Sequence, residues 1–204
     1  MKALLVAALV VLFASALTYG QGRKQVSRIE QVDFANFTFT LSAPDKDCAG
    51  LERNTVPLRK GKFKESSREP GVENGVNVSL GKIVYADLTG DHINEAVVPL
   101  TCEPFAGNYS TEVALVYTLR DGAPVLIRSL VDSKTEHDYK KYYPERSTWG
   151  GFRKVEANNG KLTIYKAADG SHICPENEVR FEYAWNGKDF VLSGKPVKTR
   201  SKNC

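Results

Sequence analysis

The sequence lacks the motifs that mark common classes of enzyme. It contains no Gly-x-Ser-x-Gly nucleophile elbow, no His-Glu-x-x-His zinc motif and no glycine-rich phosphate loop. Histidine is scarce, and a catalytic histidine needs a nucleophile or an acid within about 3 Å, which no local motif supplies. We interpret the histidines as exposed loop residues and favour a non-enzymatic domain. The three histidines are His92, His137 and His172.

After Leu17, no stretch of the chain is apolar enough to span a membrane. The uncharged run Ala3–Leu17 follows Met1-Lys2 and precedes Thr18-Tyr19-Gly20, which is the pattern of a secretory signal peptide. A membrane span needs roughly 18 to 20 apolar residues, so a signal peptide at residues 1–20 is favoured over an anchor. We therefore expect an exported protein, periplasmic or extracellular, without a membrane span.

The chain also lacks a strong excess of charge, with 28 Lys and Arg against 24 Asp and Glu and a formal net charge of +4. A nucleic-acid-binding domain would concentrate more basic residues and interleave aromatic side chains with them. We interpret the basic residues as solvated surface and expect no nucleic-acid partner. The length that remains after a signal peptide suits one core. We expect a flexible segment at 21–30 and a single β-rich domain at 31–204.

The four cysteines have no short spacing of the kind that structural zinc sites use. In an exported chain an even number of cysteines favours disulfides, and four cysteines allow three pairings. We expect one bridge in each half of the chain, because two cysteines fall in the N-terminal half and two in the C-terminal half. The expected bridges are Cys48–Cys102 and Cys174–Cys204.

Helical periodicity is absent over any long stretch, whereas alternation of apolar and polar residues is frequent. The alternation and the turn residues predict three hairpins in the second half of the chain and an earlier strand at Val32–Leu41 with a bulge near Ala35-Asn36. The fold class is therefore all-β, an antiparallel meander of hairpins that forms a curled sheet or a sandwich. The hairpins pair Thr111–Leu119 with Val125–Val131, Phe152–Glu156 with Leu162–Lys166, and Val179–Trp185 with Phe190–Leu192.

One long polar segment, Asp132–Gly151, interrupts the series of strands. It predicts either a short helix near Glu136–Tyr142 or a long surface loop. Its aromatic side chains have no regular period, and they form either a platform for a glycan or peptide, or a small core under the loop. These aromatic residues are Tyr139, Tyr142, Tyr143 and Trp149.

An acidic loop lies between two strand-like segments in the stretch Val84–Val98. Asp87, Thr89, Asp91 and Glu95 follow the 1, 3, 5, 9 spacing by which a loop places oxygen atoms around Ca2+. Such a cation would act as a structural clasp between the two strands. The alternative is a turn in which the carboxylates accept hydrogen bonds from their own backbone.

The pattern Asp-x-Thr-Gly-Asp-x-x-x-Glu resembles the calcium loops of FG-GAP repeats, the units of integrin-type propellers. Thr89 stands where those loops carry an acid, His92 stands where they carry glycine, and the loop occurs once without an internal repeat. The chain also resembles uncharacterised exported bacterial β-proteins, which implies a compartment and a fold but no activity. That resemblance is carried by Asp33-Phe34-Ala35-Asn36-Phe37, Asp87-Leu88-Thr89-Gly90-Asp91, Cys174-Pro175 and Tyr183-Ala184-Trp185-Asn186-Gly187.

Taken together, these features predict an exported, non-enzymatic β domain that serves as a binding or structural module of the cell envelope or the extracellular space. Its partner would be a protein or a glycan. Two alternatives stay open. The first is a small secreted hydrolase that brings acidic and histidine residues together from distant loops. The second is an inhibitor-type module that displays the loop Pro104–Gly107 directly after Cys102.

Overall fold

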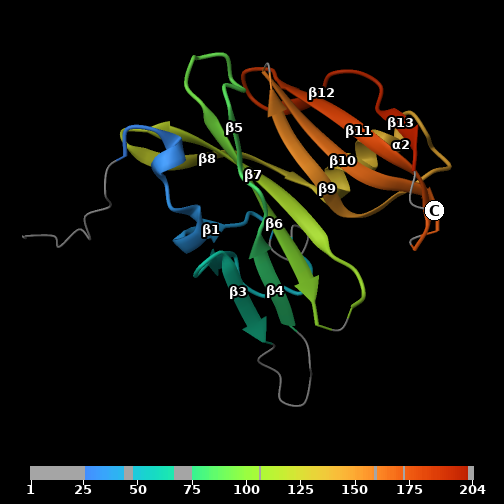
Figure 1. Cartoon of the computed structure of the whole chain (residues 1–204), viewed down its shortest axis with the longest axis horizontal. Coiled ribbons are helices and arrows are strands. Elements are labelled where there is room, and N and C mark those ends of the chain that lie inside the picture. The colour runs from blue at the N-terminus through green and yellow to red at the C-terminus, as the bar shows by residue number, and fades with distance from the viewer. Residues whose placement is uncertain are drawn as a thin grey trace, which may run out of the picture.

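The computed structural model describes residues 26–43, 48–66, 75–105, 107–158, 160–171 and 173–201. In this part of the chain two antiparallel sheets and a small N-terminal layer form one domain (Figure 1), so the all-β prediction is confirmed. The strands are β1 (Thr38–Thr40), β2 (Thr55–Pro57), β3 (Lys62–Ser66), β4 (Gly75–Leu80), β5 (Val84–Ala86), β6 (Glu95–Pro104), β7 (Thr111–Arg120), β8 (Ala123–Val131), β9 (Thr148–Asn158), β10 (Lys161–Gly170), β11 (Pro175–Trp185), β12 (Phe190–Leu192) and β13 (Val197–Arg200). The helical elements are η1 (Ile29–Gln31), η2 (Phe34–Asn36) and α2 (Asp132–Lys140).

The larger sheet has the strand order β3-β4-β6-β7-β8, and β5 also pairs with β6. Its central strands β6 and β7 separate two cores, because successive side chains of a strand point to opposite faces. Val98 and Leu115 pack into the core under the N-terminal layer. Val97 and Val116 pack into a second core that faces the smaller sheet. The domain therefore consists of three layers, with the larger sheet in the middle.

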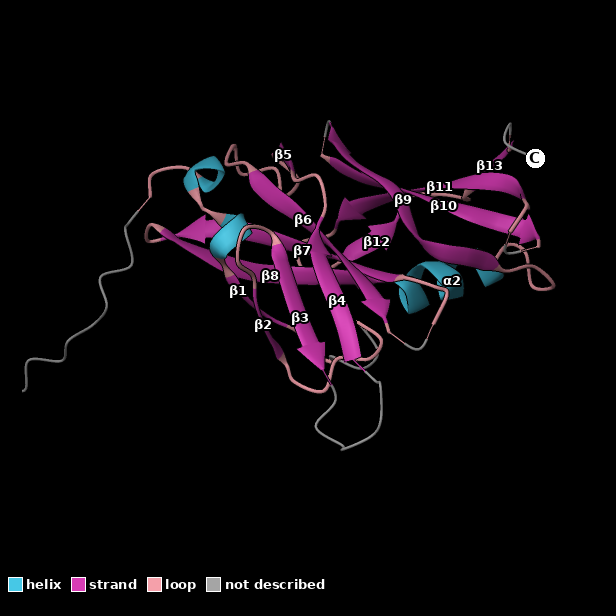
Figure 2. Cartoon of the chain, turned by 60° about the horizontal axis from the view of Figure 1, so that its bottom comes forward, coloured by secondary structure: helices cyan, strands magenta, loops and turns pink. Residues whose placement is uncertain are grey.

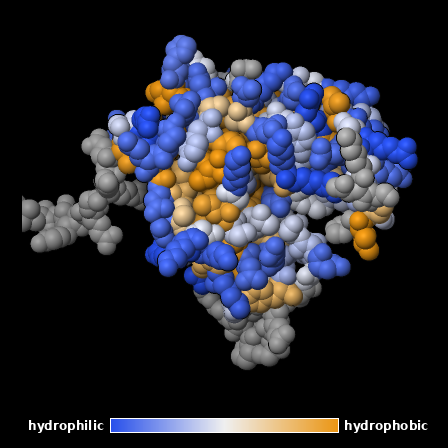
Figure 3. Space-filling model, viewed as in Figure 1, coloured by the Kyte–Doolittle hydropathy of each residue, from blue (hydrophilic) through white to orange (hydrophobic). Residues whose placement is uncertain are grey.

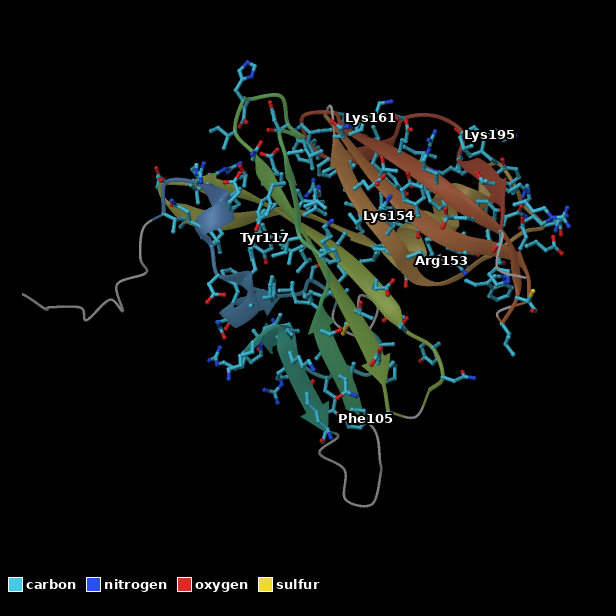
Figure 4. All side chains as sticks on the ribbon, viewed as in Figure 1. Phe105, Tyr117, Arg153, Lys154, Lys161 and Lys195 are labelled. Carbon is cyan, nitrogen blue, oxygen red and sulfur yellow. A yellow bond between two sulfur atoms is a disulfide. The ribbon has the colours of Figure 1, made fainter. Side chains whose placement is uncertain are left out.

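The N-terminal layer combines η1, η2 and the pair β1–β2. The predicted strand over residues 32–41 is wrong in its first half, because residues 34–36 form a 3-10 turn and only Thr38–Thr40 is strand. Residues three apart lie above one another in a 3-10 turn, which places Phe34 and Phe37 on one side. Both rings contact Tyr117 of β7, with centroids 5.4 and 5.6 Å away. Figure 4 shows Tyr117 beside this layer.

The smaller sheet has the strand order β12-β11-β10-β9, and β13 pairs with β11. The three predicted hairpins are confirmed, since β7 pairs with β8, β9 with β10 and β11 with β12. The main contacts between the two sheets run from β9 to β5, β6 and β7. The smaller sheet therefore covers only part of the larger one, and Figures 1 and 2 show β3 and β4 away from it.

The polar segment 132–151 begins as a helix, which is one of its two predicted forms. α2 covers Asp132–Lys140 and contacts β7, β8 and β9. Its inward side chains include Thr135, Asp138 and Tyr139, which are buried. Among the described residues no helix has both the length and the apolar character that crossing a membrane requires.

Candidate functional site

The acidic loop between β5 and β6 is held by hydrogen bonds to its own backbone. Asp87 accepts hydrogen bonds from the backbone N–H groups of Gly90, at 2.7 Å, and His92, at 3.0 Å. Asp91 accepts one from Ile93 at 2.9 Å. His92 adopts φ +66°, the left-handed conformation that glycine would take more readily. Two of the predicted calcium ligands are thus engaged in turns.

Glu95 closes the loop from the inside. Its buried carboxylate accepts hydrogen bonds from the backbone N–H groups of Leu88 and Thr89, at 2.8 and 3.1 Å, and from the Thr89 hydroxyl at 3.3 Å. Desolvation raises the pKa of Glu95, and the hydrogen bonds from the Leu88 and Thr89 backbone oppose that rise. Across the described ranges, no group of three or more His, Cys, Asp or Glu side chains is arranged to hold a metal ion. Calcium binding stays a prediction of the sequence.

The four aromatic residues of the polar segment do not form one exposed platform. Tyr139 is buried, and its hydroxyl donates a hydrogen bond to Asp169 at 2.9 Å. The ring of Tyr143 packs on Tyr139 with centroids 4.8 Å apart. Tyr142 is exposed, whereas Trp149 lies half-buried on β9. The platform hypothesis is therefore wrong for Tyr139. Tyr139 belongs to the second core, which faces the smaller sheet, and Tyr143 packs against that core.

The cysteines follow the predicted pairing where the structure describes them. Cys48 and Cys102 form a disulfide with their Cα atoms 5.4 Å apart, and both residues are fully buried. Cys174 is also disulfide-bonded, while Cys204 lies outside the described residues. A buried disulfide is typical of a chain that folds in an oxidising compartment.

The histidines give no support to a catalytic centre among the described residues. His92 and His137 are both exposed, on the acidic loop and on α2. His92 Nδ1 lies 3.9 Å from Asp87 Oδ2, which is too long for a hydrogen bond. His172 lies outside the described residues. The hydrolase alternative needs a hydrogen bond between a histidine and an acid, and neither His92 nor His137 makes one among the described residues.

A different surface emerges from the register of the larger sheet. Lys62 pairs with Ser79, Ser79 with Thr101, and Thr101 with Glu112, so these residues form one row across β3, β4, β6 and β7. A parallel row is formed by Lys64, Asn77 and Glu103. Directly paired residues share a face of the sheet, so the two rows lie side by side on one face. We call these seven residues the polar rows.

The opposite face of the same strands is packed and mostly apolar, with the buried Glu65 held in an ion pair with Arg53. Phe63, Val78 and Cys102 alternate with the polar rows and belong to the core under the N-terminal layer. The Cys48–Cys102 disulfide anchors β6 in this core at Cys102, the residue that precedes Glu103. The backbone that carries the polar rows is thus supported from behind. Figure 3 shows a mostly hydrophilic surface over β3 and β4.

Two adjoining pockets lie on the polar rows. The first has a volume of about 640 Å³ and is lined by Asn77, Glu103, the loop that follows β6, and Gly150 of β9. The second has a volume of about 590 Å³ and is lined by β3, β4 and again Asn77 and Glu103. Because both are lined by these two side chains, the pockets adjoin, and we call them together the tract.

The side chains of this tract have spare hydrogen-bonding capacity. In the described part of the chain, Asn77, Ser79, Glu103, Asn108 and Ser110 have side chains without a hydrogen bond or ion pair to the protein. Asn and Ser both donate and accept hydrogen bonds, and Glu accepts them. The tract therefore offers several polar groups to a ligand.

Two aromatic rings stand at the end of the tract. Phe105, which is labelled in Figure 4, packs on Gly75. Lys64 Nζ lies 4.8 Å from the centroid of the Phe105 ring. Tyr109 is 48% exposed, and its ring lies so close to Gly107 that a Cβ there would be 2.7 Å from Cε1. The Gly107 backbone therefore supports the Tyr109 ring and leaves much of it open to solvent.

At the β7 end of the polar rows, the buried Glu112 forms an acidic pair with Asp132, beside a lysine. Glu112 is 8% exposed, and within the described residues its Oε2 has no hydrogen-bond partner. Its backbone N–H donates to Asp132 at 3.1 Å, and Asp132 forms an ion pair with the buried Lys166 at 2.9 Å. Desolvation, with a further contribution from the charge of Asp132, raises the pKa of Glu112 to about 8. Glu112 is therefore mostly protonated at neutral pH.

The comparisons with known proteins add no relatives. No family model matches the chain, and no curated protein or solved structure is similar to it. The resemblance to FG-GAP loops and to exported bacterial β-proteins stays a prediction. Sequence reasoning missed the polar rows, because their members come from four strands that are separated along the chain. The one local signal was the alternation of polar and apolar residues in each strand.

Proposed function

We propose that this protein is an exported, non-enzymatic binding domain and that the polar rows form its binding face. The observation that carries the proposal is the free hydrogen-bonding capacity of Asn77, Ser79 and Glu103 on a face whose reverse is a packed core. A face with unpaired polar groups on a rigid support is pre-organised for a polar ligand, because little order has to be gained on binding.

Export is supported by two features. The first 20 residues have the pattern of a signal peptide. The buried Cys48–Cys102 disulfide suits an oxidising compartment such as the periplasm or the extracellular space. The partner would therefore be an envelope or extracellular molecule. An inhibitor-type role would instead use the loop after Cys102, where Phe105 packs against Gly75 and Ala106 lies outside the described residues.

The proposal is tested by mapping binding onto the amides of the mature protein. Isotope-labelled protein would be titrated by NMR with two classes of probe, soluble oligosaccharides (cellohexaose, chitohexaose) and polypeptides (casein, poly-glutamate). We expect at least one class to shift the amides of β3, β4 and β6. Asn77→Arg should abolish these shifts by filling the tract. Thr163→Arg, on the smaller sheet, is the matched control and should leave them unchanged.

Two results would overturn the proposal. One is the absence of any shift with both classes of probe. The other is a set of shifts that maps elsewhere on the surface and survives Asn77→Arg. Asn77 is exposed, so its replacement leaves the core unchanged, and the spectrum of the free variant verifies that it is folded.

A further inference from the structure

We propose that the ligand of the polar rows is a saccharide chain, with Tyr109 as the ring on which a sugar stacks. This inference rests on the proposed function and specifies its ligand class. A sugar carries hydroxyl groups that donate and accept hydrogen bonds, together with an apolar C–H face. A site for such a molecule needs polar side chains of both kinds beside an exposed aromatic ring.

The polar side chains match the hydroxyl groups of a sugar. Asn77 and Ser79 supply donors and acceptors, Glu103 supplies an acceptor, and Lys62 supplies donors. These residues come from three neighbouring strands, so they form a two-dimensional array instead of a single clamp. Such an array suits a chain with hydroxyl groups along its length.

The aromatic rings match the apolar face of a sugar. Tyr109 is half-exposed at the rim of the larger pocket, and Phe105 lines the same pocket. An exposed tyrosine presents an apolar body with a polar tip, which suits a ligand that is part apolar and part hydroxylated. Gly107 packs against one side of the ring of Tyr109 and leaves the other side to a ligand.

The charges of the tract favour a neutral ligand over a nucleic acid. Glu103 lies at the centre, between the two pockets, where it would repel phosphate groups. Lys64 places its ammonium group over the ring of Phe105. A polyanion would need a more uniform basic surface.

A protein partner is less well matched. The centres of protein interfaces are rich in apolar and aromatic side chains and poor in charged ones. On the polar rows the central positions are Asn77, Ser79, Thr101 and Glu103, and the aromatic rings stand only at the end. Hydrogen bonding therefore dominates this surface, as a hydroxylated ligand requires.

The test is calorimetric titration of the mature protein with cellohexaose, chitohexaose and glycan-strand fragments of peptidoglycan, followed by the same titrations on variants. We expect Tyr109→Ala to weaken binding by about tenfold, because the stacking contact is lost. Tyr109→Phe keeps the ring and should stay within about threefold of the wild type. Tyr142→Ala removes another exposed tyrosine, outside the tract, and is the matched control, with no expected change.

The outcomes separate this inference from the proposed function. Saccharide binding that depends on Tyr109 supports both. Polypeptide probes that shift the amides of the polar rows, while no saccharide binds, overturn the saccharide and leave the binding face standing. Saccharide binding that Tyr109→Ala does not change overturns the stacking role. No binding of either class at the polar rows overturns both proposals. Thermal unfolding of each variant verifies that the fold is intact.

Discussion

The carboxyl group of Glu112 on β7 lies directly against the backbone of Gly151 on β9. A Cβ at position 151 would be 1.5 Å from Glu112 Oε2, which is much shorter than a van der Waals contact. Gly150, the neighbour of Gly151, lines the larger pocket on the polar rows. The contact therefore joins the two sheets next to the proposed binding face.

Gly151→Ala should destabilise the protein by about 2 kcal/mol, since the added methyl group must displace the Glu112 side chain or the strand. Urea unfolding of a double-mutant cycle checks the cause. In a Glu112→Ala background the space is open, and Gly151→Ala should then cost much less. Equal costs in both backgrounds would show that the contact with Glu112 is not the reason.

Glu112 should make stability depend on pH. Its pKa is raised from 4.5 to about 8 in the folded state. The folded state therefore holds a proton that the unfolded chain releases, so stability falls as pH rises from about 4.5 and levels off above about 8. The slope is at most about 1.4 kcal/mol per pH unit for one group.

Glu112→Gln tests this origin, because the amide has the same shape and does not titrate. Unfolding free energies measured from pH 5 to pH 9 should fall less steeply in the variant than in the wild type. Asp132, whose pKa burial also raises, contributes a residual slope of the same sign. Identical slopes in both proteins would contradict the raised pKa of Glu112.

Glu95→Ala should destabilise the acidic loop by about 2 kcal/mol or more, because two backbone N–H groups lose their buried acceptor. Glu95→Gln keeps one acceptor oxygen and should destabilise the protein less.

Thermal unfolding of the wild type in Ca2+ and in chelator tests the calcium hypothesis. The calcium loop that the spacing predicts requires a higher melting temperature in Ca2+ than in chelator, and Asp87→Ala should remove that rise. Equal melting temperatures would leave the loop as a turn without a metal.

Removal of the Cys48–Cys102 disulfide should cost about 2–5 kcal/mol. The bridge spans 54 residues and lies in the core behind the polar rows. The double variant Cys48→Ala/Cys102→Ala would be compared with the oxidised wild type by urea unfolding. If the free energies agree within about 0.5 kcal/mol, the bridge does not support this core.

Local patterns alone determined much of the strand architecture. The alternation in Thr111–Leu119 and the Asp121-Gly122 turn predicted the β7–β8 hairpin, and both turn residues adopt positive φ, 51° and 72°. Hairpin contacts join residues that are close in the chain, so the information is local. The cysteine pairing at 48 and 102 followed from the division of the chain into halves.

Where one pattern permits two structures, the sequence alone does not choose between them. The spacing of Asp87, Asp91 and Glu95 suits both a calcium loop and a hydrogen-bonded turn. The hydrogen bonds of the turn depend on where the buried Glu95 carboxylate lies, and calcium binding stays a prediction. Phe34 and Phe37 read as strand residues, yet a 3-10 turn brings both rings onto Tyr117.

The sequence by itself thus determined the all-β class, the later hairpins and the expectation of export, because each depends on neighbours along the chain. The polar rows were decided only by the tertiary structure. Lys62, Asn77 and Glu103 belong to separate strands, and a shift of one residue in their pairing would turn a polar row toward the core. That register is set by the burial of Phe63, Val78 and Cys102 on the reverse face. The candidate site is therefore a consequence of the core behind it.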